Sequence, residues 1–189
     1  MVVLGIDPGI KRIGIALVDV SKKELLYSTV ANSPVEFYTR LLELPKLPNV
    51  IIVEAISPWG VAPMTVVFTA TVMGMMLVPM LGEFLLQVPV YFIQRQSIKS
   101  LLVGSAKARD KDVRDYLIGF WGKEQCKRAK VKGDAWSALA LATLPAFFNL
   151  EVLQQNEYMR ELKQLVEEWL NAPMQAILVD TNKEGEEML

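Results

Sequence analysis

Three acidic residues stand where they could do chemistry. Asp7 ends the uncharged apolar run 2–6, Glu54 closes a second apolar run, 50–53, and Asp134 opens an alanine-rich segment. Carboxylates that crowd together repel one another unless a cation lies between them. Hard oxygen ligands without a soft partner favour Mg²⁺ or Mn²⁺. The three acids together therefore predict a divalent metal site.

Each acid alone also has an ordinary structural interpretation. Asp7 precedes Pro8-Gly9 and could be a turn residue, Asp134 could cap a helix, and Glu54 could pair with a lysine. An acid that closes a wholly apolar strand is costly to bury, however, and this happens twice in the chain. The combination favours the metal site over three separate structural roles.

The composition excludes several other kinds of site. The 189 residues include no histidine, which excludes histidine-based zinc sites and serine–histidine triads. Gly5, Gly9 and Gly14 do not have the dinucleotide-binding spacing, and no P-loop is present. The single cysteine, Cys126, excludes an internal disulfide framework and fits a reducing compartment.

Short strands and helices must position the acids. The pattern predicts strands at 2–6, 13–20, 25–31, 50–53 and 89–93, and helices at 34–44, 107–121 and 134–148. A long apolar helical segment lies between the fourth and fifth strands. This order predicts an α/β fold, in which an antiparallel meander continues into βαβ units and helices cover both faces of a mixed five-stranded sheet.

The topology would bring the acids together. In open α/β sheets, ligands bind outside the carboxyl ends of the strands, where Asp7 and Glu54 would meet. After Asp134, small or apolar side chains recur at helical spacing, so one face of that helix should lie close against the sheet. These residues are Ala135, Ala138, Leu139 and Ala142.

We expect one main domain at 1–150, a charged amphipathic helix at 151–171 and an acidic, mobile tail at 172–189. Segment 61–90 carries a single charge, Glu83, but prolines and glycines interrupt it and no Lys or Arg cluster flanks it closely. A buried helix is therefore favoured over a membrane span. Its 61–86 part could pack on a partner subunit.

The net charge of −1 hides a basic block. Residues 94–132 contain eleven basic and four acidic side chains, whereas residues 133–189 contain three basic and ten acidic ones. Local charge is what a phosphate backbone experiences. We expect the two basic stretches, 95–114 and 123–132, to border the acids, although a solvated helix face is the alternative because Asp110, Asp112 and Asp115 are interleaved.

Four stretches, in this order, resemble the RuvC family of Holliday junction resolvases, and its shorter, phage-type members most of all. They are "GIDPGIKRIGIAL", "VIIVEAISPWG", "QSIKSLLVGSAKARDKDVRDYL" and "KGDAWSALALA", and the resemblance covers residues 1–148. Many RNase H-like proteins share the first motif, whereas the ordered set of four is more specific. The resemblance implies an RNase H-like fold, a two-metal nuclease site, a homodimer and branched DNA as substrate. It also implies a cytoplasmic location in a bacterium or a phage-infected host.

The catalytic residues follow from the same resemblance. Asp7, Glu54 and Asp134 match the family's first-strand aspartate, fourth-strand glutamate and last-helix aspartate, so the resemblance makes them both catalytic residues and metal ligands. The ions would be Mg²⁺ or Mn²⁺, two per site and about 3.5–4 Å apart. Many resolvases carry a fourth ligand one helical turn before the last aspartate. Here that position is Val131, so three carboxylates are matched.

Candidate DNA-binding residues surround these acids. Basic side chains neutralise phosphates, and Trp59, just past Glu54, could stack on an unpaired base or simply pack in the fold. The predicted set is Lys11, Arg12, Trp59, Arg95, Lys99, Lys107, Arg109, Lys111, Arg114, Lys130 and Lys132.

Three other interpretations stay open. The first motif also resembles YqgF-type nucleases of ribosomal RNA processing, but those usually lack a glutamate at the position of Glu54. Actin-like kinases and ATPases share an opening Asp-Gly-type turn, but they need a second glycine-rich phosphate loop and a longer chain. A non-catalytic DNA-binding protein with the same fold is the third, and Val131 is the best argument for it.

Overall fold

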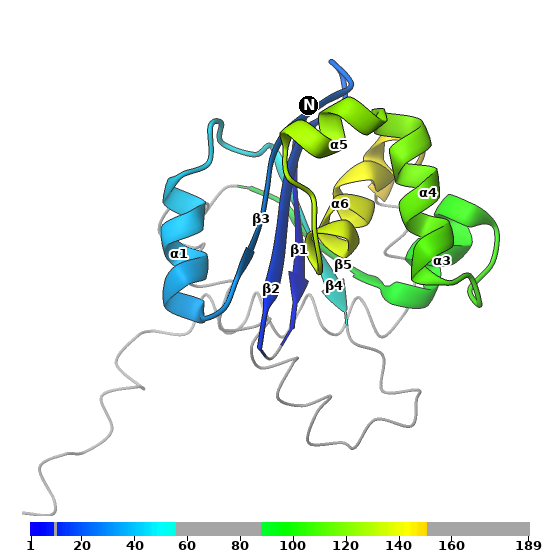
Figure 1. Ribbon diagram of the computed structural model, residues 1–189, viewed down its shortest axis with the longest axis horizontal. Coiled ribbons are helices and arrows are strands. Elements are labelled where there is room, and N and C mark those ends of the chain that lie inside the picture. The colour runs from blue at the N-terminus through cyan, green and yellow to red at the C-terminus, as the bar shows by residue number, and fades with distance from the viewer. Residues whose placement is uncertain (10, 56–87, 151–189) are drawn as a thin grey trace, which may run out of the picture.

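The computed structural model describes residues 1–9, 11–55 and 88–150, which form one sheet with helices on both faces (Figure 1). The strands are β1 (Val2–Pro8), β2 (Ile13–Asp19), β3 (Glu24–Ala31), β4 (Val50–Ala55) and β5 (Val90–Gln94). Their order across the sheet is β3-β2-β1-β4-β5. β2 is antiparallel to β1 and β3, whereas β4 is parallel to β1 and β5. The predicted mixed five-stranded sheet is confirmed.

The central strands are apolar on both faces because both faces are covered. Val3 and Ile52 point into one core, beneath helices that follow β5 in the chain. Leu4 and Ile6 point into the other, where Phe37, from the helix between β3 and β4, is fully buried. Side chains alternate between the faces along a strand, so position within β1 and β4 decides which core a residue joins.

The helices differ in part from those expected. They are α1 (Pro34–Leu42), α3 (Arg95–Val103), α4 (Asp110–Trp121), α5 (Lys123–Arg128) and α6 (Ala135–Thr143), followed by a 3₁₀ turn at Leu144–Ala146. α1 begins where predicted: the Ser33 hydroxyl accepts a hydrogen bond from the Glu36 backbone N–H, and Pro34 takes the first helical position. α3 and α5 were not predicted, and α4 begins at Asp110 rather than at 107.

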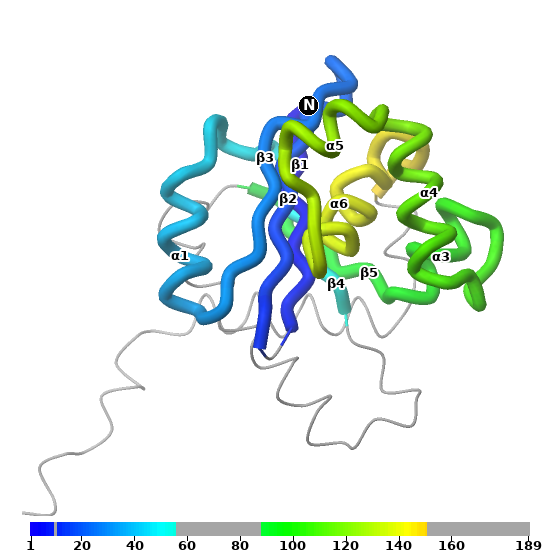
Figure 2. The backbone as a smooth tube through the Cα atoms, viewed as in Figure 1, coloured from blue at the N-terminus to red at the C-terminus, as the bar shows by residue number. Residues whose placement is uncertain are grey.

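Two glycines allow α6 to lie directly on the sheet. A Cβ atom at Gly5 would collide with the Ala138 carbonyl oxygen, and one at Gly14 would collide with the Asp134 carbonyl oxygen. Both glycines face the α6 side, because they alternate with Ile6 and Ile15 of the opposite core. The prediction that a small-residue face of this helix lies close to the sheet is confirmed. The contact fixes the start of α6 beside the end of β1 (Figure 2).

Several expectations fall outside the described residues. These are the 61–86 helical segment, Trp59, the 151–171 helix and the 172–189 tail. Within the described part of the chain, no helix is long and apolar enough to cross a membrane.

Candidate active site

Asp7 and Glu54 lie side by side at one edge of the sheet. In the parallel register of β1 and β4, Ile6 pairs with Val53, so the next residue on each strand is an acid. Ile6 and Val53 point into the core on the α1 side of the sheet. Because successive side chains of a strand point to opposite faces, both acids point toward the α6 side. The expectation that two strand-ending acids meet at the carboxyl edge is therefore confirmed.

Burial raises the pKa of both acids. Glu54 is 7% exposed, and loss of solvation followed by repulsion from Asp7 raises its pKa to about 7. Desolvation likewise raises the pKa of Asp7 to about 6, against the favourable effect of Arg95 and of a hydrogen bond from the Ser137 side chain. Glu54 Oε2 is buried and has no hydrogen-bond partner. A buried, unpartnered carboxylate oxygen calls for a cation.

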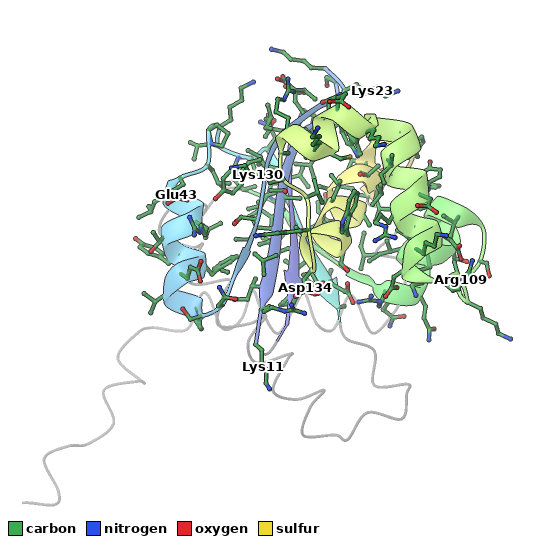
Figure 3. The ribbon with its side chains drawn as sticks, viewed as in Figure 1. Lys11, Lys23, Glu43, Arg109, Lys130 and Asp134 are labelled. Carbon is green, nitrogen blue, oxygen red and sulfur yellow. The ribbon has the colours of Figure 1, made fainter. Side chains whose placement is uncertain are left out.

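Asp134 stands next to this pair but faces a different residue. It occupies the N-cap position of α6, yet its side chain makes no capping hydrogen bond. Instead, the Arg12 Nε lies 2.9 Å from Asp134 Oδ2. Figure 3 shows Asp134 at the end of the sheet from which Lys11 projects. Asp134 thus lies at the predicted place, and it occupies the N-cap position that was the alternative interpretation, but its carboxylate pairs with Arg12 instead of capping the helix.

A network of cations borders the acid pair. Arg95, the first residue of α3, places its Nη1 3.5 Å from Glu54 Oε1 and its Nη2 3.1 Å from Asp110 Oδ2. The Lys99 ammonium lies 2.9 Å from the other oxygen of Asp110. Because these two cations hold it, the pKa of the Asp110 carboxyl is lowered, with Lys99 the larger cause.

These groups line a cavity of about 410 Å³ between β4, α3, α4 and α6. Its walls include Glu54 and Asp134 together with Arg95, Lys99, Lys111 and Arg114. Three acids, of which Glu54 is buried and Asp110 is exposed, line the cavity together with the four basic side chains. This mixture suits a ligand that is anionic yet requires a cation.

The donor set fits a divalent cation, although the acids are not assembled around one. Among the described residues, no group of three acidic or cysteine side chains is close enough to hold a metal ion. Guanidinium groups are the counter-charges: Arg95 lies against Glu54, and Arg12 against Asp134. Asp7, Glu54 with its unpartnered Oε2, and Asp134 would offer only hard oxygen atoms, which Mg²⁺ and Mn²⁺ prefer.

No protein-family model matches the chain, and no curated protein is similar to it in sequence. Solved structures do match. The structure of Thermus thermophilus RuvC superposes with a TM-score of 0.65 at 24% identity, covering 81% of this chain and 98% of that one. T. thermophilus RuvC in complex with Holliday junction substrate gives a TM-score of 0.64 at 25% identity, covering 78% and 93%. The chain has the RuvC fold. The predicted RuvC-like, RNase H-like architecture is confirmed.

Within the RuvC fold, two residues of the site were missed by sequence reasoning. Ser137 lies one helical turn after Asp134 and hydrogen-bonds to Asp7, so it reaches the acid pair where Val131 does not. Val131 is half-buried and packs against the core on the α6 side. The second missed residue is Asp110, which entered the sequence analysis only as one of the acids that favoured the alternative of a solvated helix face. The i, i+3 spacing from Asp134 is the feature that points to Ser137.

The first basic stretch borders the acids as expected, but not every one of its members does. Arg95, Lys99, Lys111 and Arg114 line the cavity. Arg95 and Lys99 belong to α3 rather than to a connection. The guanidinium of Arg109 is instead 3.0 Å from the Asp112 carboxylate, and Figure 3 shows Arg109 on the outer side of α4. Lys107 is exposed in the connection between α3 and α4.

The second basic stretch lies elsewhere for most of its length. Helix α5 sits at the opposite end of the sheet, because Gln125 accepts a hydrogen bond from the Leu25 N–H and donates one to the Lys23 carbonyl (Figure 1). The expectation that all of 123–132 borders the acids is therefore wrong for residues 123–128. Lys130 and Lys132 are exposed in the connection between α5 and α6, which leads to Asp134.

Proposed function

We propose that this protein is a divalent-metal-dependent endonuclease that cuts four-way or otherwise branched DNA by phosphodiester hydrolysis. One observation carries the proposal: Asp7 and Glu54 lie side by side in a RuvC fold, a buried Glu54 oxygen is unpartnered, and Glu54 lines a cavity together with four basic side chains. One neighbour in fold is a RuvC in complex with Holliday junction substrate, which supports branched DNA as the ligand.

The residues of this chain would divide the work. Asp7, Glu54 and Asp134 would hold the cation, and Ser137 would orient Asp7. When bound, divalent cations supply a nucleophilic water at neutral pH and neutralise charge on the phosphate. The basic side chains of the cavity wall, Arg95, Lys99, Lys111 and Arg114, would bind the phosphates on either side of the scissile one.

Arg12 and Lys11 extend the proposed DNA surface from the β1–β2 connection. Arg12 already lies at the site through Asp134, and Lys11 is exposed beside it. Lys107, Arg109, Lys130 and Lys132 are proposed as outer phosphate contacts, since each is exposed. Trp59 stays a sequence prediction.

A homodimer is part of the proposal, because symmetric resolution of a junction needs two active sites. Its interface is expected in the 61–86 segment. Analytical ultracentrifugation at micromolar concentration should give the mass of a dimer, and a strictly monomeric mass would contradict this part of the proposal.

A second candidate function is branched-DNA binding without cleavage. It is favoured by the absence of an assembled three-acid group among the described side chains and by the guanidinium groups that face Glu54 and Asp134. In that case the cavity would bind phosphate through its basic walls alone.

The two functions separate in one assay. The protein is incubated with labelled four-way junction, linear duplex or RNA, in Mg²⁺, in Mn²⁺ or in EDTA, alongside Asp7→Asn. Paired symmetric nicks on the junction that disappear in EDTA and in the variant support the endonuclease. Binding without cleavage in either metal supports the second function, and preferential cutting of RNA points to the YqgF-type alternative.

A further inference from the structure

Arg95 occupies a position that local helix physics does not favour. It is the first residue of α3, where the helix presents its positive end and a cation is destabilising. No acidic residue lies in that first turn to compensate it. Its compensation comes from two other elements, Glu54 at the end of β4 and Asp110 at the start of α4. A residue placed against its local preference points to a functional constraint.

The two acids do not hold Arg95 equally. The contact with Glu54 is 3.5 Å long and involves Oε1. The other oxygen, Oε2, has no hydrogen-bond partner, and the Glu54 side chain is only 7% exposed to solvent. The contact with Asp110 is shorter, 3.1 Å, and the Asp110 carboxylate is 71% exposed. Arg95 itself is 45% exposed, so its guanidinium bridges the closed base and the open wall of the cavity.

We propose that Arg95 is a displaceable counter-cation for the acid pair. In the cation-free protein it neutralises Glu54, and when a divalent cation binds there it moves fully onto Asp110. Its guanidinium then lies on the cavity wall, where a phosphate can reach it. Lys99 holds the second oxygen of Asp110 and so keeps that acceptor in place. The inference rests on the proposed metal site and adds a positioning residue to it.

Competition between Arg95 and Mg²⁺ for Glu54 predicts a rise in Mg²⁺ affinity when the arginine is removed, which structural damage would not produce. Two cations that share one carboxylate oppose each other, so removal of the arginine should tighten Mg²⁺ binding, by about tenfold for a partly buried charge. Loss of Asp110 should act in the opposite direction. Without its second acceptor, Arg95 stays on Glu54 and Mg²⁺ binds more weakly, by roughly three- to tenfold.

Calorimetric titration of Mg²⁺ into the full-length, DNA-free protein tests the first effect. The titration is run at about pH 9, where loss of Arg95 cannot act by leaving Glu54 protonated. Arg95→Gln should bind Mg²⁺ about tenfold more tightly than the unmodified protein. Arg95→Lys, which keeps the charge, should bind more weakly than Arg95→Gln. Arg40→Gln removes a guanidinium that also bridges two carboxylates, but on α1, and should leave Mg²⁺ affinity unchanged.

The second effect has its own charge-matched control. Asp110→Asn should weaken Mg²⁺ binding. Asp112→Asn removes the same charge from the same helical turn, but its carboxylate pairs with Arg109 rather than with Arg95, so it should change affinity much less. In the Arg95→Gln background, Asp110→Asn should do no more than Asp112→Asn does, because its effect passes through Arg95.

Each result decides one claim. Tighter binding by Arg95→Gln, together with loss of the Asp110→Asn effect in the double variant, supports the displaceable counter-cation. Unchanged or weaker binding by a folded Arg95→Gln protein overturns it while leaving the metal site intact. Absence of Mg²⁺ binding by the unmodified protein overturns the metal site and, with it, this inference.

Discussion

Two arginines of this molecule each bridge two carboxylates, but of these four acids Glu54 differs from the others, because its pKa is raised whereas theirs are lowered. On α1, Arg40 lies 3.1 Å from Glu36 and 3.0 Å from Glu43, and the pKa of both acids is lowered. At the carboxyl end of β4, Arg95 bridges Glu54 and Asp110, yet the pKa of Glu54 is raised to about 7.

Solvation and hydrogen bonding explain the difference. Glu36 accepts hydrogen bonds from the Asn32 backbone and side chain in addition to its contact with Arg40. Glu54 is buried beside a second acid, Asp7, and one of its oxygens has no partner. One arginine therefore satisfies a half-buried acid that accepts other hydrogen bonds, but it does not satisfy a buried pair of acids. A contact with an arginine is therefore not enough to identify a structural ion pair, because Asp7 and Glu54 still require positive charge although Arg95 contacts Glu54.

We call Arg40 with Glu36 and Glu43 the α1 cluster, and Arg95 with Glu54 and Asp7 the buried cluster. The largest expected difference between the two clusters is in catalysis. Glu54→Gln should lower the rate of junction cleavage by at least about 10²- to 10³-fold, the range for loss of a group that stabilises charge in the transition state. Glu36→Gln changes the same functional group on α1 and should leave the rate unchanged. Single-turnover cleavage of labelled junction in Mg²⁺ measures both. Equal rates for Glu54→Gln and the unmodified protein would remove the distinction between the clusters.

The pH dependence of stability should have opposite signs in the two clusters. The raised pKa of Glu54 means that the unfolded chain ionises first, so metal-free stability falls as pH rises from about 4.5 to about 7. Glu54→Gln should therefore stabilise the metal-free protein above about pH 7, on the order of 2–3 kcal/mol, and leave it unchanged near pH 4. Glu36, with its lowered pKa, contributes stability above about pH 4.5 that is lost as pH falls, so Glu36→Gln should destabilise.

Urea unfolding in EDTA across this pH range measures both effects. The two variants should diverge from the unmodified protein in opposite directions as pH rises. If the free energy of unfolding of both variants shifted in the same direction as pH rises, burial would not explain the difference between the two clusters.

The close approach of α6 should matter only for the buried cluster. Gly14→Ala forces the Asp134 carbonyl away from the sheet and should destabilise the fold by about 1–3 kcal/mol. It should also weaken Mg²⁺ binding, because Asp134 moves with α6. Gly119→Ala in α4 meets no atom and serves as the control, with unchanged or slightly higher stability. Thermal unfolding with and without Mg²⁺ compares them, and equal behaviour of the two variants would contradict the packing argument.

The smallest effect is expected at the exposed pair of the site. Arg12 is 59% exposed, so loss of its contact with Asp134 should change stability by less than about 0.5 kcal/mol. If Arg12 contacts a phosphate, Arg12→Gln should lower junction affinity and reduce the salt dependence of binding by about one ion. Fluorescence anisotropy over a series of salt concentrations gives the slope, and Arg40→Gln on α1 should leave it unchanged.

Much of the fold was predictable because local pattern and topology agree. The apolar strands of residues 2–6 and 50–53 are buried on both faces, and their acids meet because parallel strands end at one edge. Helix α3 was missed because it begins with Arg95, an unfavourable N-terminal residue whose acids come from other elements. Helix α5 was missed because it spans only six residues after Gly122.

The chemical state of the site was less predictable than its position. Asp7 and Glu54 could be named from where they end their strands, whereas their raised pKa values depend on burial that only packing creates. Asp110 and Ser137 join the site through helix placement. Neither residue stands beside an apolar strand end, the feature that identified Asp7 and Glu54 in the sequence.

The central claim is that the buried Asp7–Glu54 pair binds a divalent cation, and proton release tests it most directly. Binding to carboxylates displaces their protons. With pKa values of about 6 and about 7, the pair should release on the order of one proton per Mg²⁺ binding event near pH 6.5. Calorimetric titration in two buffers of different ionisation enthalpy counts that proton. Release of about one proton, lost in Glu54→Gln, is the predicted result; Mg²⁺ binding with no proton release would contradict the account.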